Sequence, residues 1–205
     1  MGQARRAMFH VKHEGWTSSD PTAEQVERLH RYLSILRERG ASLGLVSKAD
    51  VPHLWMRHIE DSLRAIPLIP SATRSVCDLG SGGGLPGIPL AIVRPDLDVI
   101  LTEPRRLRAG FLELAVEAVP VRNAAVFAGP AADLGTQADV VVARGFGDAR
   151  TTWAAAEPLL RPAGRLLYWA GATFSPEALP EGVLVELATE VSLESGGPIV
   201  IMTRQ

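Results

Sequence analysis

The sequence has very little cysteine, no long hydrophobic run and almost no net charge. Cys77 is its single cysteine, so no intrachain disulfide can form, which is compatible with a reducing cytosol. The first twenty residues contain no apolar stretch of the kind found in secretory signals. The longest apolar segment, 85–93, is interrupted by two prolines and is far shorter than a membrane span. We therefore expect a cytoplasmic protein that does not insert into membranes.

The charge balance also limits the kinds of partner. A formal net charge of −2 and a pI of about 6.2 argue against a protein that coats polyanions without specificity. These values do not exclude a local basic face. The length of 205 residues predicts one domain with a short additional lobe.

The first part of the chain predicts helices. Asp20 and Pro21 resemble a helix N-terminus, an apolar stripe follows at three- and four-residue spacing, and Gly40 ends the pattern. A second helical stretch is expected over 51–66. Residues 1–70 are therefore interpreted as an N-terminal arm and helical cap.

Beyond Pro70, strands alternate with helices, which is typical of a mostly parallel sheet covered on both faces. We expect a Rossmann-like, seven-stranded α/β core over 71–205, with one antiparallel strand near the edge. The helix over 105–119 is expected to carry Leu107, Phe111, Leu114 and Val119 on one side. The expected strands are 75–79, 97–102, 124–128, 139–143, 165–169, 183–191 and 199–203, and the other expected helices are 85–93 and 149–160.

The strongest motif is a glycine-rich loop between a strand and a helix, DLGSGGGLPG over 78–87. It lets a ligand lie against bare backbone at the carboxyl edge of a parallel sheet. Glu103 follows Gly80 by 23 residues, at the end of the next strand, where a carboxylate can accept both hydroxyls of a ribose. This pairing predicts a ligand that contains adenosine.

The loop alone does not decide between a dinucleotide and S-adenosylmethionine. The dinucleotide pattern fails when counted from Gly80, but it fits when counted from Gly82. Two features favour S-adenosylmethionine. Asp78 stands where it can face the cationic amino acid end of that ligand, and Pro86 and Pro89 remove amide donors that a pyrophosphate would use.

Three segments, taken together, resemble the ribosomal RNA small-subunit methyltransferase G family, also called glucose-inhibited division protein B. They are RHIEDS over 57–62, DLGSGGGLPGIPLAI over 78–92 and ARGF over 143–146. The resemblance covers about residues 25–205. It implies an S-adenosylmethionine-dependent enzyme that methylates N7 of one guanine in 16S rRNA, as naked RNA or within the small ribosomal subunit.

The resemblance also implies roles for individual residues. The expected cofactor-binding residues are Asp78, Gly80, Gly82, Leu85, Glu103, Ala131, Ala132 and Arg144. The chain departs from the family at Pro130, where many members have arginine, and at Ala170, where many have lysine. Both departures remove a cation and bear on RNA affinity and target identity.

The proposed chemistry needs few special groups. Guanine N7 has a lone pair and no proton, so an in-line methyl transfer requires positioning and exclusion of water but no general base. The sequence shows no evident catalytic triad, metal cluster or close carboxylate pair, which fits this reaction, and we expect no metal.

Three residues are the candidates for the catalytic centre: Arg144, His58 and Asp61. Arg144 can bind a phosphate, hold the methionine carboxylate or donate to guanine O6, because its planar guanidinium suits each of these acceptors. The alternative is a structural ion pair with Asp148 or Asp139. His58 and Asp61 either shape the substrate pocket or form an ordinary hydrogen-bonded pair that joins the cap to the core.

The candidate RNA contacts are less specific. Arg57, Arg105 and Arg106 are expected to meet phosphates, with Arg108 beside them, although a solvated helix face explains such arginines as well. Phe146 either stacks on the target base or packs in the core. His10, Lys12 and His13 lie in an arm that orders on RNA or is a simple tail.

Other function classes stay open at this point. They are a small-molecule methyltransferase, a catalytically silent RNA-binding or assembly factor, and an NAD-dependent reductase. For the 16S rRNA methyltransferase we expect a monomer.

Overall fold

The computed structural model describes residues 21–193 and 196–205. The predicted cap Asp20 and the arm with His10, Lys12 and His13 lie outside these ranges. The first helix, α1 (Ala23–Arg39), is capped by Thr22, whose hydroxyl accepts a hydrogen bond from the Gln25 amide at 3.2 Å. The Gln25 side chain in turn accepts from the Thr22 amide at 2.8 Å, which completes a capping box. The helix ends before Gly40, as predicted.

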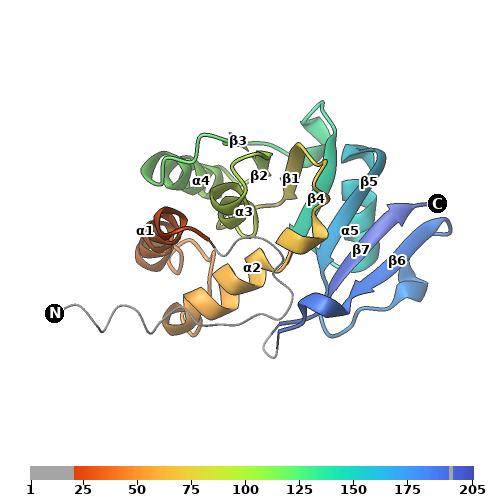
Figure 1. Ribbon diagram of the computed structural model, residues 1–205, viewed down its shortest axis with the longest axis horizontal. Helices are drawn as coiled ribbons and strands as arrows, with labels where there is room; N and C mark the ends of the chain where they lie inside the picture. The colour runs from red at the N-terminus through yellow and green to blue at the C-terminus, as the bar shows by residue number, and fades with distance from the viewer. Residues whose placement is uncertain (1–20, 194–195) are drawn as a thin grey trace.

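One seven-stranded sheet runs through the molecule in the order β3-β2-β1-β4-β5-β7-β6 (Figure 1). Five strands pair in parallel, and β7 is antiparallel to both of its neighbours. The expected sheet with one reversed strand near the edge is confirmed. The strands are β1 (Ser75–Leu79), β2 (Asp98–Thr102), β3 (Ala124–Phe127), β4 (Ala138–Arg144), β5 (Leu160–Trp169), β6 (Val183–Ala188) and β7 (Ile199–Arg204).

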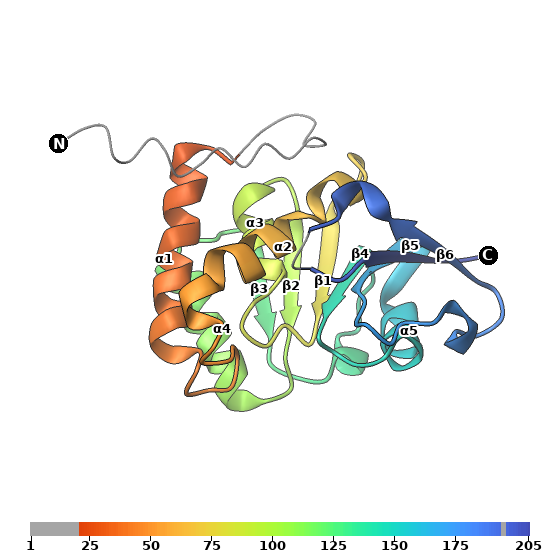
Figure 2. The same ribbon diagram turned by 90° about the horizontal axis from the view of Figure 1, so that it is seen from below.

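Helices cover both faces of the sheet (Figure 2). Alternate residues of the central strand β4 enter two separate hydrophobic clusters, Val140 and Val142 on one face, Val141 and Ala143 on the other. The first face is covered by α1, α2 (Asp61–Leu63), α3 (Gly87–Val93) and α4 (Arg106–Ala118), and the second by α5 (Ala149–Ala156).

In the ranges given above, no helix combines the length and the apolar character needed to cross a membrane.

The helical stretch expected over 51–66 is present but irregular. It consists of a 3₁₀ turn (Val51–His53), a π-helical segment (Trp55–Glu60), α2 and a second 3₁₀ turn (Ile66–Leu68). Wide π turns inside helices are rare and are frequent at functional sites. Here the π-helical segment carries Arg57 and His58, two of the predicted site residues.

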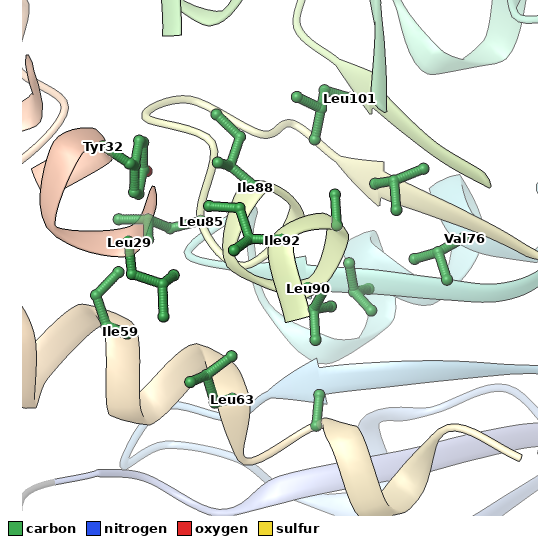
Figure 3. Close-up of a cluster of buried hydrophobic side chains, with 14 of the residues drawn as sticks. Leu29, Tyr32, Ile59, Leu63, Val76, Leu85, Ile88, Leu90, Ile92 and Leu101 are labelled. Atoms are coloured by element: carbon green, nitrogen blue, oxygen red, sulfur yellow. The ribbon is translucent and has the colours of Figure 1, made fainter. Parts of the chain in front are cut away.

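The cap packs directly on the glycine loop. Leu29 and Tyr32 of α1 and Ile59 and Leu63 of the irregular stretch meet Leu85 and the first residues of α3 in one buried cluster (Figure 3). The Tyr32 hydroxyl donates a hydrogen bond to the carbonyl oxygen of Gly83. The helical cap is therefore part of the support of the loop.

The expected apolar face of α4 is buried except at its N-terminal end. Phe111 and Val119 are buried and Leu114 is half-buried, but Leu107 is 78% exposed. Leu107 belongs to the first turn of α4, where residues 21–193 and 196–205 leave most of its side chain uncovered. The buried stripe continues instead through Leu112 and Ala115.

Candidate functional site

The predicted site residues come together at the carboxyl edge of the sheet. Gly80 follows β1, Glu103 follows β2, and Arg144 ends β4, and these three strands are neighbours. In open α/β sheets, ligands bind in the crevice outside the carboxyl ends of the strands.

The main chain at Gly80 tolerates no side chain. Its φ is +67°, and a Cβ placed there would lie 2.7 Å from the ring of Phe146. Thr102 fixes the loop, because its hydroxyl accepts from the Gly80 amide at 3.2 Å and donates to the Asp78 carbonyl at 2.9 Å. The glycine therefore serves both the turn and the close approach of another group.

Glu103 lies against the same loop. Its side chain is buried, and its two oxygens accept from the amides of Gly82 at 3.1 Å and Arg105 at 2.9 Å. A carboxylate offers about four acceptor positions. These two hydrogen bonds orient the carboxylate and leave acceptor capacity for a ligand hydroxyl.

Asp78 is a buried carboxyl with one unused oxygen. Its Oδ2 accepts from the Gly87 amide at 2.9 Å, whereas Oδ1 has no hydrogen-bond partner in the described part of the chain. Burial raises the pKa of Asp78 to about 7, because a carboxylate loses solvation there. An unsatisfied buried acceptor of this kind fits a cationic group of a ligand.

A largely apolar cavity of about 490 Å³ opens beside Gly80, and we call it the loop pocket. Ala131 and Ala132, in a 3₁₀ turn after β3, line it as the resemblance implies, together with Phe146. Thr102 and Pro104, the chain neighbours of Glu103, line the same wall.

Five expected cofactor residues do not line the loop pocket: Asp78, Gly82, Leu85, Glu103 and Arg144. Leu85 packs in the hydrophobic cluster below the loop (Figure 3), where its side chain supports α3 and α1. Pro130, where many family members carry arginine, lies in the pocket wall.

A second cavity of about 640 Å³, the arginine pocket, lies beside Arg144. Its wall includes Arg57, Asp61, Tyr168 and Ala170, the position where many family members have lysine. The connection from β4 to α5 separates the two pockets, because Arg144 and Gly145 line the arginine pocket and Phe146 lines the loop pocket.

Arg144 is held by the cap, which the sequence did not indicate. Its guanidinium donates to Asp61 Oδ2 at 3.0 Å and lies 3.1 Å from His58 Nδ1. The alternative ion pairs with Asp148 or Asp139 are wrong. Asp148 instead caps α5 by accepting from the Thr151 amide. Asp139, in β4, pairs with Arg161 of the neighbouring strand β5.

His58 and Asp61 both contact Arg144, and in the described part of the chain they form no hydrogen bond with each other. Burial, reinforced by the positive charge of Arg144, lowers the pKa of His58 to about 4. The ring is therefore neutral near pH 7, and Nδ1 accepts from Arg144. The proton then sits on Nε2, a buried atom without a hydrogen-bond partner among the described residues.

The candidate RNA contacts lie on several elements at this edge of the sheet. Arg105 and Arg106 are exposed at the start of α4, and Arg108 donates to the Gly44 carbonyl at 3.1 Å. The side chain of Arg57 is half exposed and pairs with Asp50. Phe146 is 39% exposed, so the expectation of a core position is wrong.

Sequence reasoning missed two groups of the site. Trp169 donates from its indole to the Asp61 carbonyl at 3.2 Å, and the buried Arg64 donates to Asp61 Oδ1 at 2.7 Å. Only the three-residue spacing of Asp61 and Arg64 on a helical stretch could have indicated that pair.

No group of three or more potential metal ligands forms among residues 21–193 and 196–205. Cys77 is buried in the sheet, and burial raises the pKa of its thiol to about 12.

The fold and this site together define a class of protein. The strand order, the single reversed strand and the glycine loop followed by an acid are those of a Rossmann-like class I methyltransferase. The ribosomal protein L11 methylase from Lactobacillus delbrueckii subsp. bulgaricus shares this fold, with a TM-score of 0.53 at 15% identity over 70% of this chain and 76% of that chain.

Sequence comparison then gives the family. The family model described as rRNA small subunit methyltransferase G matches residues 25–191. The chain is 36% identical over 190 residues to the ribosomal RNA small subunit methyltransferase G of Streptomyces avermitilis, covering 81% of this chain and 79% of the relative. It is 42% identical over 139 residues to that of Thermobifida fusca, covering 67% and 58% respectively. The chain belongs to the rRNA small subunit methyltransferase G family.

Proposed function

We propose that this protein transfers a methyl group from S-adenosylmethionine to N7 of a guanine in 16S rRNA, as a cytoplasmic monomer without a metal. The observation that carries the proposal is the pair of pockets separated by residues 144–146. The loop pocket exposes the backbone at Gly80 and the small side chains of Ala131 and Ala132, and the arginine pocket contains the guanidinium of Arg144.

The residues around the loop pocket fit the methyl donor. When bound, S-adenosylmethionine supplies a methyl group on a positively charged sulfur. Ala131 and Ala132 in its wall are proposed to contact the adenine ring. Glu103 and Asp78, which adjoin the lining residues Thr102, Pro104 and Leu79 in the chain, are proposed to bind the ribose hydroxyls and the cationic amino end.

The arginine pocket is proposed to receive the target base. Neither Asp61, in its wall, nor His58, beside Arg144, is suited to removing a proton near pH 7. His58 has a pKa of about 4 and uses Nδ1 to accept from Arg144, and both oxygens of Asp61 accept from guanidinium groups. Guanine N7 has no proton to lose, so these residues need only orient the base and exclude water.

The RNA chain itself is proposed to lie along the carboxyl edge of the sheet. The exposed arginines at this edge, Arg105 and Arg106 at the start of α4 and Arg57 in the π-helical segment, are the proposed phosphate contacts. Phe146 is the proposed stacking partner for a base or for the adenine of the cofactor.

The test is methylation of small ribosomal subunits and of free 16S rRNA from a strain that lacks the gene. Incubation with the protein and labelled S-adenosylmethionine is expected to label one guanine, and cleavage chemistry specific for 7-methylguanine locates it. The absence of label on any rRNA would overturn the proposal.

One observation favours a second candidate, a small-molecule methyltransferase. Pro130 and Ala170 lie in the walls of the two pockets, where many family members carry cations. Calorimetric binding of S-adenosylmethionine without transfer to rRNA would support this candidate. A silent assembly factor would not need to bind the methyl donor, and a reductase would bind a nicotinamide cofactor instead.

A further inference from the structure

Arg64 is a buried arginine that lies behind the arginine pocket. It is 4% exposed, and each of its three nitrogens donates to a different acceptor. Nε donates to the Val191 carbonyl, Nη2 donates to the Gly197 carbonyl at 2.9 Å, and Nη1 donates to Asp61 Oδ1 at 2.7 Å. Gly197 and Asp61 line the arginine pocket, whereas Arg64 does not.

Asp61 is thereby shared between two arginines. Its Oδ1 accepts from Arg64 and its Oδ2 accepts from Arg144, at 2.7 and 3.0 Å. A carboxylate that faced Arg144 alone would form a closed, neutral pair with it. With Arg64 present, the group of two guanidinium ions and one carboxylate carries one excess positive charge, and Arg144 is the member of the two that reaches the pocket wall.

We propose that Arg64 is a positioning residue of the arginine pocket, which neutralises Asp61 so that the charge of Arg144 remains available to an acceptor on the substrate. The inference rests on the proposed function, because the acceptor is a guanine O6 or a phosphate of the methylated RNA. Arginine suits this place, since it stays charged when buried and its fork satisfies several carbonyls at once.

The decisive comparison separates charge from anchoring. Arg64→Met removes the excess positive charge and also the hydrogen bonds to Val191 and Gly197. Adding Asp61→Asn to Arg64→Met restores the excess charge without restoring those hydrogen bonds. Arg64→Lys keeps the charge but loses the fork.

Steady-state methylation of small subunits is measured for each variant. Arg64→Met is expected to raise the KM for the subunit about tenfold, with a smaller change in kcat, because a charged contact to the substrate is weakened. The double variant is expected to have a lower KM than Arg64→Met, and Arg64→Lys is expected to remain within about threefold of the wild-type KM. A double variant no better than Arg64→Met, or an Arg64→Met variant with wild-type KM, would overturn the inference.

Folding and the proposed function are checked in the same series. Binding of S-adenosylmethionine by calorimetry is expected to be equal in the wild type and the single Arg64 variants, since Arg64 donates to Val191, Gly197 and Asp61, which lie outside the glycine loop. If Arg64→Met does not fold, Arg64→Gln replaces it, because its amide can still donate to Gly197. A wild-type protein that methylates no rRNA would contradict the proposed function, whereas an active wild type with unaffected variants would contradict only the role of Arg64.

Discussion

Asp78 shows how strongly the fold changes the chemistry of a single residue. Its carboxyl is almost completely buried below the glycine loop, and its pKa is raised to about 7 by the loss of solvation. In the unfolded chain an aspartate ionises near pH 4. Its negative charge is therefore unfavourable in the folded protein unless a cation lies nearby.

This position predicts a pH-dependent affinity for the cofactor. A cationic group binds the ionised carboxyl better than the protonated one, so S-adenosylmethionine is expected to bind more tightly as the pH rises through about 7. Asp78→Asn keeps an acceptor for the Gly87 amide but does not titrate. Calorimetry between pH 6 and 8 should show a steeper dependence for the wild type than for this variant, which controls for titration of the ligand itself. Equal slopes would show that Asp78 does not face the cationic end.

Ionisation of Asp78 is also expected to lower the stability of the folded protein without cofactor, although it strengthens cofactor binding. The folded state holds the proton of Asp78 up to about pH 7, whereas the unfolded state releases it near pH 4. Stability relative to Asp78→Asn is therefore expected to fall as the pH rises from about 4 to about 7. Denaturant unfolding of the two proteins at several pH values measures this difference, and a constant difference would contradict the raised pKa.

Glu103 allows a second test of the loop pocket. Glu103→Ala removes the proposed acceptor for the ribose hydroxyls and also the bonds to the amides of Gly82 and Arg105. The Kd for S-adenosylmethionine is expected to rise about tenfold or more, since hydrogen bonds to a charged group contribute about 1.5–3 kcal/mol. Glu103→Gln retains acceptor capacity and should lose less. An unchanged calorimetric Kd in Glu103→Ala would remove the main support for the cofactor assignment.

At the scale of elements, α1 and the glycine loop behave as one unit. Tyr32 of α1 donates to the Gly83 carbonyl, and a Cβ at Gly83 would lie 3.3 Å from Leu36 of the same helix. Gln25, at the other end of α1, donates to the carbonyl oxygens of Ile92 and Val93 at the end of α3. The cap thus fixes the loop and the helix that follows it.

The two tyrosines of the chain provide a matched pair for testing this contact. Tyr32→Phe leaves the Gly83 carbonyl without its donor and is expected to weaken S-adenosylmethionine binding about threefold to tenfold, because an unsatisfied buried carbonyl destabilises the loop by about 1–2 kcal/mol. Tyr168 donates in the same manner to the Gly147 carbonyl, at 3.0 Å, but in the wall of the arginine pocket. Tyr168→Phe should leave the calorimetric Kd for the cofactor unchanged. Equal effects of both changes would indicate a general loss of stability rather than a role of α1 in the loop.

For the whole molecule, the distribution of charge matters more than its sum. The net charge of −2 gives no general attraction to RNA. The exposed arginines at the start of α4 lie at the carboxyl edge of the sheet, the same edge as both pockets. Binding of RNA should therefore depend on this edge alone.

Salt dependence provides the corresponding measurement. Replacing Arg105 and Arg106 together with alanine is expected to weaken RNA binding and to lower the slope of log K against log salt by about one to two, since each phosphate contact releases about one counterion. Arg161→Ala is the control, because Arg161 is an exposed arginine at the opposite edge, paired with Asp139. Fluorescence anisotropy on a 16S rRNA fragment measures both. An equal loss of affinity in the control would place the RNA elsewhere.

The elements of the core were predictable because their patterns are local. The alternation of strands and helices, the glycine loop and the acid after the second strand are contained in short stretches of sequence. The errors lie where a partner is distant. Leu107 has the spacing of a buried residue, but the described part of the chain leaves its side chain largely exposed. Arg144 pairs with Asp61, 83 residues earlier in the chain, instead of a nearby aspartate.

The amino-acid order alone determined the family, the seven-stranded sheet and the loop beside which a nucleotide can lie, because each depends on propensity, periodicity and glycine at particular positions. Only the tertiary structure decided which charges meet. It joined Arg64, Asp61 and Arg144 through two ion pairs, raised the pKa of Asp78 and lowered that of His58. These properties depend on burial and on distances between segments that are remote in sequence, and neither is encoded in any single segment.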